Sequence, residues 1–502
     1  MGNPKIVLTA DRTLMSPYRG LSLATFFGCA PAIDPHRDKS SFWYKILKNQ
    51  VTPKILFDFI CNYIPHTNGV ANFAPYGLRK LEAGLLRDGF RRDEVVVAHP
   101  DHIEQFIGPD TQVVGTYEMD PLGMGPVTMT FTYGRKQISY DELYNTELHH
   151  RIKAAKEKTG SKAKVISGAS GTWQYNYDPE KIQEFGIYAI LEGELGGIAP
   201  EIDGHAGRFF NYLINDGRFV NFWDRPDLDE IPDIVEPSMH GMVEVMRGCG
   251  RGCKFCDVTL RSLRYYPPEK VKKEIEVNMK KGGSTSAWIH SDDIFVYGMD
   301  PRTAKGMEPN REALEELFTA IMSTGVQHTN PTHGTLAGAI ADEKLIPNLS
   351  RIIKSGPDNM TGVQAGFETG SLRLIEKYAD RKLAPYHPEE WHWVVKEGVK
   401  TLNKYYWIPA FTLIMGLDND ETPEDSWETI SLISELEHEQ PSSMFTTTAL
   451  TFVPIGLLEK SDFFNIGNEM TPAQLGVLYK TWQHNFKYGI QKFMNKTGAK
   501  GP

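Results

Sequence analysis

The stretch Cys249-Gly-Arg-Gly-Cys253-Lys-Phe-Cys256 holds three of the five cysteines in the 502-residue chain. A cubane iron–sulfur cluster normally takes four thiolates, and the other two cysteines, Cys29 and Cys61, lie far away in the sequence. A zinc site usually has two CxxC-like pairs or accompanying histidines, and the sequence has neither nearby. So few cysteines in so long a chain also argue against a disulfide framework. The spacing therefore predicts a [4Fe–4S] cluster on Cys249, Cys253 and Cys256, with one iron open to another ligand.

Downstream of these cysteines, short apolar segments alternate with helical patterns as far as residue 456. Such alternation is typical of parallel strands with helical crossovers, and six strands are too few for a complete eight-stranded barrel. We therefore expect a partial (β/α)6 barrel over residues 240–456, followed by a helical C-terminal extension over 457–502. The expected strands are Val243–Met246, Ser286–Ile289, Val326–Thr329, Gly362–Phe367, Trp407–Met415 and Met444–Phe452.

Upstream, residues 1–222 show a second α/β pattern, which predicts a Rossmann-like domain with a parallel, doubly wound sheet. Such sheets bind ligands at the carboxyl ends of their strands. Residues 26–75 interrupt the pattern as a mostly helical insertion, which either covers a pocket or adds scaffold. Residues 223–239 are rich in proline and acid, as expected of a linker. The expected strands are Ile6–Leu8, Val95–Ala98, Val113–Thr116, Ala163–Ser167 and Tyr188–Leu191, with helices at Gly77–Asp88 and Tyr140–Thr159.

Composition narrows the class of protein. The formal net charge of -10 argues against non-specific nucleic-acid binding, which needs a basic surface. The first apolar stretch is too short for a signal peptide, and no apolar run reaches the length of a membrane span. We therefore expect a cytoplasmic protein that binds neither nucleic acid nor membrane.

The cysteine spacing, with Phe255 before the last cysteine, resembles the radical S-adenosylmethionine (SAM) superfamily. In that family the open iron binds SAM through its amino and carboxylate groups. The resemblance implies that Phe255 packs on the adenine of SAM. It also implies that Asp293, in Ser291-Asp292-Asp293, holds the SAM amine, although the glycines usual in that segment are missing here.

A later segment, Gly366-Phe367-Glu368-Thr369-Gly370-Ser371, resembles the fourth-strand segment of one branch of the same family. The resemblance implies that Glu368 reaches the ribose or amino group of SAM, and it places Ser371 in the same site. The alternative is that Glu368 only caps the following helix, because acidic residues are favoured near helix N-termini.

The N-terminal region resembles the cobalamin-binding domains that precede the radical SAM core in a large branch of the family. Ser167-Gly168-Ala169-Ser170-Gly171 follows the fourth expected strand, and Glu192-Gly193-Glu194 resembles the end of such a domain. The resemblance implies cobalamin, with Thr116, Ser167, Gly168 and Glu192 beside it. The Asp-x-His-x-x-Gly segment of other cobalamin-binding enzymes is absent, so we expect no histidine ligand to cobalt. The alternative is an ordinary Rossmann-like domain without cobalamin.

Together these features resemble the cobalamin-dependent radical SAM methyltransferases. The resemblance implies methylation of an unactivated sp³ carbon, an anaerobic reaction that needs a one-electron reductant. Over its full length the chain is most similar to archaeal enzymes that methylate a glutamine carbon in methyl-coenzyme M reductase, a post-translational modification. That similarity implies a protein or peptide substrate, namely the alpha subunit of that reductase. One alternative is a related enzyme acting on a peptide natural product, a lipid or a small molecule, with or without net methyl transfer. A non-catalytic electron carrier is the other, but a carrier would not need SAM-binding segments.

Overall fold

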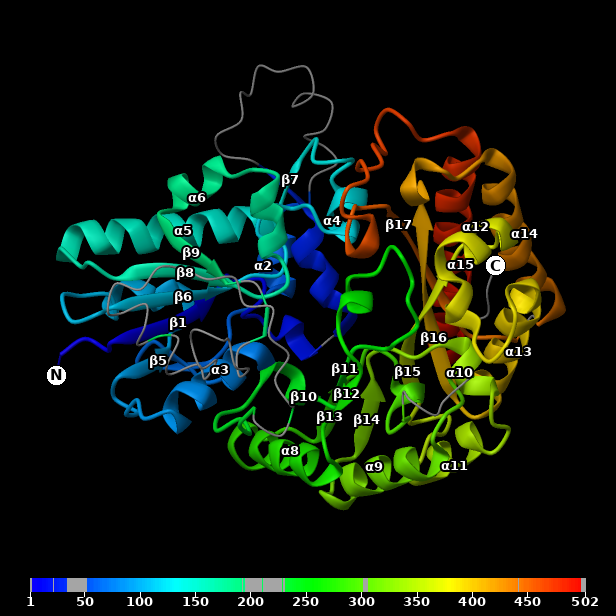
Figure 1. Ribbon diagram of the computed structural model, residues 1–502, viewed down its shortest axis with the longest axis horizontal. Coiled ribbons are helices and arrows are strands. Elements are labelled where there is room, and N and C mark those ends of the chain that lie inside the picture. Colours follow the sequence, from blue (N-terminus) through cyan, green and yellow to red (C-terminus); the bar gives the residue numbers. More distant parts are fainter. Residues whose placement is uncertain are drawn as a thin grey trace. The chain divides into compact units, whose positions relative to one another are not determined.

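The computed structural model describes residues 2–20, 22–33, 52–191, 193–194, 210, 228, 231–300, 306–440 and 442–497. The chain divides into two compact units (Figure 1). Unit 1 comprises Met1–Val243 and Lys273–Ser284, and unit 2 comprises Glu244–Lys272 and Thr285–Pro502. Most of residues 195–230 lie outside the described part, so the expected linker over 223–239 stays a prediction. Among the described residues, no helix is long and apolar enough to cross a membrane.

Unit 1 is built on a five-stranded parallel sheet in the order β5-β1-β6-β8-β9. All five expected strands are present, because each falls on a short run of buried, mostly β-branched or apolar residues. The first strand lies between the second and the third along the chain. The order therefore reverses between β1 and β6, where sheets of this kind bind ligands. The strands are β1 (Ile6–Ala10), β5 (Val95–Val97), β6 (Val113–Tyr117), β8 (Lys164–Gly168) and β9 (Ile187–Leu191).

Helices cover both faces of this sheet, with α3 (Tyr76–Arg87) on one side and α5 (Tyr140–Thr159) on the other (Figure 1). The sequence sets both ends of α5. Ser139 accepts a hydrogen bond from the backbone N–H of Glu142 at the start, and Gly160 ends the helix with a left-handed φ of 69°. The remaining elements of unit 1 include β2 (Pro31–Ala32), α2 (Lys54–Ile60), β3 (His66–Thr67), β4 (Val70–Ala71), α4 (Pro126–Phe131), β7 (Ile138–Ser139) and α6 (Glu180–Phe185).

The expected insertion over 26–75 is only partly described, because residues 34–51 fall outside. Its described part contains the 3₁₀ helix η2 (Ser22–Cys29), the helix α2 and the β3–β4 hairpin. Strand β2 pairs with β7, which ties the insertion to the segment just before α5.

The six expected strands form two three-stranded sheets, in the orders β10-β13-β14 and β15-β16-β17, and all of them except the start of β10 belong to unit 2. A parallel bridge between His333 and Gln364 joins the two sheets, and the pairs β13–β14, β15–β16 and β16–β17 are parallel. Alternate residues of β16 are buried, as expected for a strand that packs one face on a core. The strands are β10 (Met242–Glu244), β13 (Ser286–His290), β14 (His328–Pro331), β15 (Thr361–Glu368), β16 (Trp407–Met415) and β17 (Thr446–Thr451).

Helices follow these strands and form the outer layer, which gives the partial (β/α)6 barrel that the sequence predicts (Figure 1). They are α9 (Arg311–Ser323), α10 (Leu336–Ile340), α11 (Leu345–Ile353), α12 (Leu372–Ala379), α13 (Trp391–Lys404) and α14 (Pro423–Glu439), while α8 (Pro268–Gly282) crosses the division between the units.

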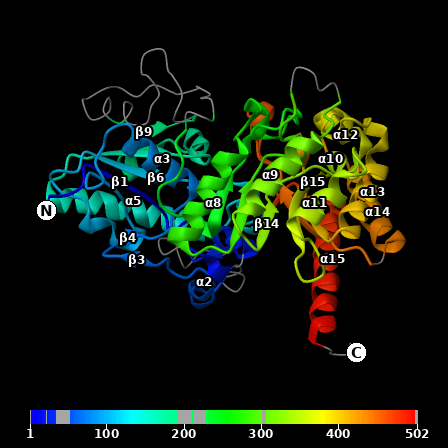
Figure 2. The same ribbon diagram turned by 90° about the horizontal axis from the view of Figure 1, so that it is seen from below.

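The C-terminal extension is helical, as expected. Helix α15 (Pro472–Thr497) is anchored on α14 by Lys480 and His484, whose nitrogens lie 2.7 and 2.9 Å from the carboxylate of Glu437. Its C-terminal part extends beyond the neighbouring helices (Figure 2).

Candidate cofactor-binding sites

The cysteine loop lies between β11 (Met246–Arg247) and the 3₁₀ helix η7 (Asp257–Leu260). Gly248, Gly250 and Gly252 have φ values of 74°, 70° and 79°, which glycine adopts far more readily than other residues. A Cβ atom on Gly248 would also lie 2.6 Å from the carbonyl oxygen of Ser262. These glycines allow the loop to turn tightly, as expected for a chain that wraps around a cluster.

Side chains from the neighbouring strand end hold this loop in place. The carboxylate of Asp292 accepts a hydrogen bond of 2.6 Å from the backbone N–H of Gly248. The side chain of Arg251 is 1% exposed, and its Nε lies 2.6 Å from Oδ2 of Asp293. Its Nη1 donates to the carbonyl oxygens of Lys382 and Ala384 at 2.9 and 3.0 Å.

Backbone contacts fix the second half of the loop. The N–H of Lys254 donates to the carbonyl of Tyr378, and the N–H of Leu457 donates to the carbonyl of Lys254, both at 2.9 Å. A Cβ on Gly456 would lie 2.6 Å from the carbonyl oxygen of Cys256, so the chain passes very close to the last cysteine. The loop is therefore held by the end of β13, by α12 and the segment after it, and by the segment that follows β17.

The thiols of the loop have raised pKa values. Burial raises the pKa of Cys249 to about 11 and that of Cys256 to about 12, and it also raises the pKa of Cys253. Metal ligands must be thiolates, so these thiols need a bound positive charge to ionise at neutral pH.

One polar atom beside the cysteines supports a bound group there. Within the described part of the chain, Nη2 of Arg251 is buried and has no hydrogen-bond partner. Buried donors of this kind are rare and call for a ligand or ion beside them. Three thiols on a tightly turned loop and an unused guanidinium N–H together fit a [4Fe–4S] cluster.

The structure places the expected SAM residues near this loop or at strand ends of unit 2. Phe255 is partly buried within the loop itself. Asp293 is 1% exposed, and besides Arg251 it accepts hydrogen bonds from Phe295 N–H at 3.2 Å and from Thr335 N–H and hydroxyl at 3.1 and 3.0 Å. Asp293 thus holds Arg251 in place, a role that the sequence did not suggest. Its contact with SAM stays a prediction.

Glu368 ends β15 at an irregularity in the strand, with a left-handed φ of 60°. Its Oε1 lies 2.7 Å from Nζ of Lys382, and both side chains are buried. Burial alone would lower the pKa of Lys382, but the charge of Glu368 holds it above its ordinary value. A charged carboxylate at a strand end is suited to binding an ammonium or ribose hydroxyl.

Ser371, and not Glu368, caps the helix that follows. The hydroxyl of Ser371 accepts a hydrogen bond of 3.3 Å from the N–H of Leu374 at the start of α12. It also donates to Asp425, and Ser371 is fully buried. The capping alternative for Glu368 is therefore wrong. The structure gives Ser371 a structural role, and its contact with SAM stays a prediction.

In unit 1, the carboxyl ends of β6 and β8 meet at a buried glutamate that the sequence reasoning missed. Glu118 is 1% exposed and accepts hydrogen bonds from the hydroxyls of Thr116 and Ser167 at 2.7 and 2.9 Å. His149 Nε2 and the Tyr175 hydroxyl lie 2.7 and 2.8 Å from the same carboxylate. Burial opposes ionisation of Glu118, but the hydrogen bond with His149 lowers its pKa below the ordinary value. The network keeps the strand ends in a fixed arrangement.

The expected cobalamin residues lie at this same edge of the sheet. Thr116 and Ser167 are buried side by side at 3.0 Å, with their hydroxyls engaged by Glu118. Gly168 accepts the backbone N–H of Glu118 at 2.9 Å and is followed by Ala169 at a left-handed φ of 86°. Glu192 lies outside the described residues.

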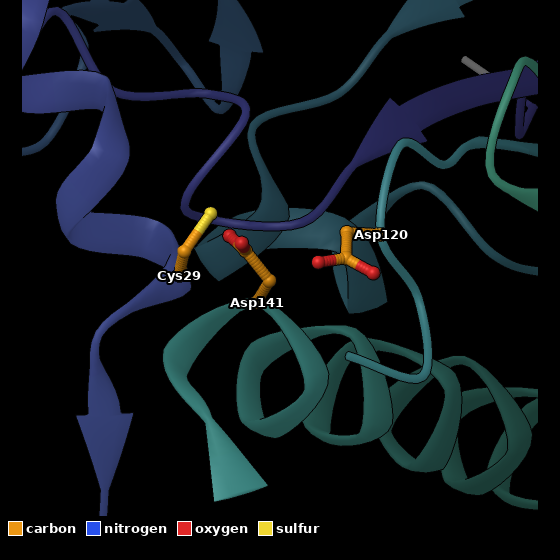
Figure 3. A group of neighbouring side chains, drawn as sticks. All are labelled: Cys29, Asp120 and Asp141. Carbon is orange, nitrogen blue, oxygen red and sulfur yellow. The ribbon is translucent and has the colours of Figure 1, made fainter. Parts of the chain in front are cut away.

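Three further side chains converge beside this edge: Cys29 at the end of η2, Asp120 after β6, and Asp141 in the first turn of α5 (Figure 3). One ligand atom of each lies within 4.8 Å of the other two. Burial raises the pKa of Cys29 and of Asp141 well above their ordinary values. This end of the sheet is therefore lined by acidic groups, which no motif in the sequence indicated.

Comparison with known proteins gives two kinds of similarity. No model of a known family matches the chain. It is 28% identical over 127 residues to the ribosomal protein uS12 methylthiotransferase RimO of Chlorobium limicola, covering 24% of this chain and 29% of the relative. It is 25% identical over 232 residues to a tRNA-2-methylthio-N(6)-dimethylallyladenosine synthase of Thermus thermophilus, covering 44% of each chain. The chain thus spans less than half the length of these relatives.

The fold comparison covers more of the chain. The structure of the cobalamin-dependent S-adenosylmethionine radical enzyme OxsB with aqua-cobalamin bound aligns with 86% of this chain and 52% of its own, with a TM-score of 0.51 and 11% sequence identity. The chain therefore shares the fold of OxsB over most of its length; in this chain that fold is a parallel α/β sheet and a partial barrel, with the cysteine loop near the first strand of the barrel.

Proposed function

We propose that the chain is a cobalamin-dependent radical SAM methyltransferase that acts on an unactivated sp³ carbon. The observation that carries the proposal is the loop of Cys249, Cys253 and Cys256, in which Arg251 has a buried N–H without a partner. The fold shared with OxsB supports it. The similarity to a ribosomal protein methylthiotransferase and to a tRNA-2-methylthio-N(6)-dimethylallyladenosine synthase is further support for SAM chemistry.

Different parts of the chain would hold the three cofactors. The three cysteines would bind a [4Fe–4S] cluster, and Phe255, Asp293, Glu368 and Ser371 are the proposed contacts of SAM. The strand ends of unit 1, with Thr116, Ser167, Gly168 and Glu192, would bind cobalamin. When bound, these groups supply radical hydrogen abstraction and a transferable methyl group, which a carbon without a nucleophilic electron pair requires.

The protein's own residues would position these groups. The glycines of the cysteine loop permit close approach of the backbone, and Asp292 and Arg251 fix its conformation. The buried carboxylate of Glu368 would orient SAM through its ribose or ammonium group. Glu118 and its four partners would keep the cobalamin-binding edge of the sheet rigid.

For the substrate we propose a glutamine in the alpha subunit of methyl-coenzyme M reductase. The reaction on this glutamine would require a one-electron reductant as a further partner. The full-length resemblance described from the sequence supports this choice. A second candidate is a radical SAM and cobalamin enzyme that acts on a peptide natural product, a lipid or a small molecule, with or without net methyl transfer.

Mass spectrometry of a peptide substrate tests the proposal. The protein would be reconstituted anaerobically with iron, sulfide and cobalamin, then given SAM, a reductant and a glutamine peptide from the reductase. A gain of one CH₂ on glutamine, absent with the Cys249→Ala, Cys253→Ala, Cys256→Ala variant, is the expected result. Turnover of SAM with no change in peptide mass would reject this substrate and favour the second candidate.

A further inference from the structure

Arg251 is the only residue inside the cysteine loop whose long cationic side chain is fully enclosed by protein. It stands two positions after Cys249 and two before Cys253, and it is 1% exposed. A guanidinium carries five N–H groups and seeks partners for them when it is buried. Here Nε and Nη1 have protein partners, whereas Nη2 has none within the described part of the chain.

The hydrogen-bond partners of Arg251 fix the orientation of its guanidinium group. Asp293 is 1% exposed, and both of its oxygens are already engaged by Phe295 and Thr335. The two carbonyls that accept from Nη1 belong to Lys382 and Ala384, in a separate segment after α12. The guanidinium is therefore held from two sides, so its third nitrogen stays where it is.

Arg251 also lies within electrostatic range of the thiols. Burial raises the pKa of Cys249, and both the backbone N–H and the charge of Arg251 act in the opposite direction. For Cys253, burial again raises the pKa, while Lys382 and Arg251 oppose it. Asp293, which pairs with Arg251, raises the pKa of Cys249 in turn, so the feature that distinguishes Arg251 beside the thiols is its buried N–H without a partner.

Lys382 is the other buried cation near these thiols, but its situation differs. It acts on Cys253 and Cys256, and its ammonium is paired with Glu368 at 2.7 Å. The ammonium nitrogen of Lys382 has a partner in Glu368, whereas Nη2 of Arg251 is buried and has none within the described part of the chain. Of the two cations in this described region, Arg251 is the one with a donor left over for a bound group.

We propose that Arg251 donates its free N–H to a sulfur of the bound [4Fe–4S] cluster and raises the cluster's reduction potential. This inference rests on the proposed function, because it requires the cluster. Reduction adds one electron from the one-electron reductant and makes or breaks no bond. A hydrogen bond to sulfur favours the reduced state of the cluster, which carries one more negative charge. Asp293 orients the guanidinium, which explains a buried acid after β13 even without contact to SAM.

The test is the midpoint potential of the reconstituted cluster, measured by EPR-monitored redox titration without substrate. Arg251→Gln removes the charge and most of the N–H donors. Arg251→Lys keeps the charge but loses the planar arrangement of N–H donors that the guanidinium provides. Arg311→Gln is the matched control, because Arg311 also pairs with a carboxylate, Asp342, but lies on α9 away from the cysteine loop in sequence. Iron content and the melting temperature of the cluster-free proteins are measured beside it.

We expect Arg251→Gln to make reduction at least tenfold less favourable, a shift of 59 mV to more negative potential for one electron. Arg251→Lys should shift less, and Arg311→Gln should not shift. If Arg251→Gln retains no iron while its cluster-free form melts like the wild type, contact between Arg251 and the cluster is supported, and the shift in potential is then measured on Arg251→Lys.

Three results would overturn the inference. One is a potential of Arg251→Gln equal to that of the wild type. Another is loss of the cluster from both Arg251 variants together with a lowered melting temperature of their cluster-free forms, which would make Arg251 purely structural. The third is a wild-type protein that takes up no [4Fe–4S] cluster, which would sink the proposed function as well. The first two leave the proposed function intact.

Discussion

Glu368 is a buried carboxylate with one cationic partner and a left-handed backbone, both at a strand end. A left-handed conformation strains the backbone of a residue other than glycine. Such strained residues are found most often at active sites and ligand-binding sites, where the surrounding structure holds them in place. Because Ser371 caps the next helix, capping does not explain Glu368. The carboxylate of Glu368 then either pairs with Lys382 alone or also binds SAM. A single substitution distinguishes these two roles.

Glu368→Gln keeps the shape of the side chain and removes its charge. Lys382 would then be a buried ammonium without its counter-charge, which should cost about 3 kcal/mol of unfolding free energy. If Glu368 also binds SAM, the dissociation constant for SAM should rise about tenfold or more, since charge-assisted hydrogen bonds contribute about 1.5–3 kcal/mol. Calorimetric titration with SAM and urea unfolding measure the two effects. Unchanged SAM affinity in a destabilised protein would limit Glu368 to holding Lys382.

Asp11, directly after β1, makes the stability of unit 1 depend on pH. Burial raises its pKa from 3.8 to about 6, against hydrogen bonds from Thr13. The folded state therefore binds the proton more tightly than the unfolded state. This stabilisation is complete below pH 3.8 and is lost as pH rises through about 6.

Asp11→Asn resembles the protonated form and should not show this loss. Between pH 4 and pH 7, the unfolding free energy of the wild type should fall by about 2 kcal/mol relative to that of the variant. Urea unfolding of both proteins at each pH measures the difference between their unfolding free energies. Other titrating groups, such as Asp141, contribute to both proteins and cancel in this difference. Parallel pH profiles for the two proteins would contradict the prediction.

At the scale of residues, the sequence predicted what a local motif specifies and missed what the tertiary fold brings together. The cysteines and Glu368 were found because they stand in short, recognisable segments. Glu118 was missed because its partners come from β6, α5, β8 and the segment after β8. Likewise, Arg251 and Asp293 are 42 positions apart, and no spacing rule joins them.

At the scale of elements, strand β15 shows how one glycine makes room for a buried ion pair. A Cβ atom on Gly366 would overlap the carboxylate of Glu368 and the ammonium of Lys382. Gly362, on the same strand, would meet nothing within 4 Å. The two glycines therefore form a matched pair for testing the site.

Gly366→Ala should displace the Glu368–Lys382 pair without removing either charge. We expect weaker SAM binding, similar in size to that of Glu368→Gln, and a loss of about 1–3 kcal/mol from overpacking. Gly362→Ala should change stability by less than about 0.5 kcal/mol and leave SAM binding as it is. Equal SAM affinities for the two variants would show that the ion pair does not contribute to the SAM site.

Most elements were predictable because their signals are local. The strands fall on short apolar runs, and α5 has a serine cap and a terminal glycine at its two ends. The short strands β11 and β12 (Arg264–Tyr265), which flank the cysteine loop, were not predicted. Two-residue pairings carry too little pattern to be seen in sequence, although they position the loop.

At the scale of the whole molecule, the chain contains a parallel α/β sheet and a partial barrel with a cysteine loop, and most of it aligns with the fold of OxsB. The sequence predicted both parts, since each repeats strands and helices in a regular order. The substrate was not predictable in the same way, because recognition depends on surfaces for which the sequence has no motif.

The central claim is that Cys249, Cys253 and Cys256 hold a cluster that cleaves SAM reductively. The most direct measurement is 5′-deoxyadenosine formed from SAM by the anaerobically reconstituted, reduced protein, compared with the triple Cys→Ala variant and with Cys29→Ala, Cys61→Ala. The account predicts 5′-deoxyadenosine from the wild type and from the Cys29 and Cys61 variant, and none from the triple variant, which should also bind no cluster iron. Equal 5′-deoxyadenosine from the triple variant, or none from a wild type that carries a full [4Fe–4S] cluster, would contradict it.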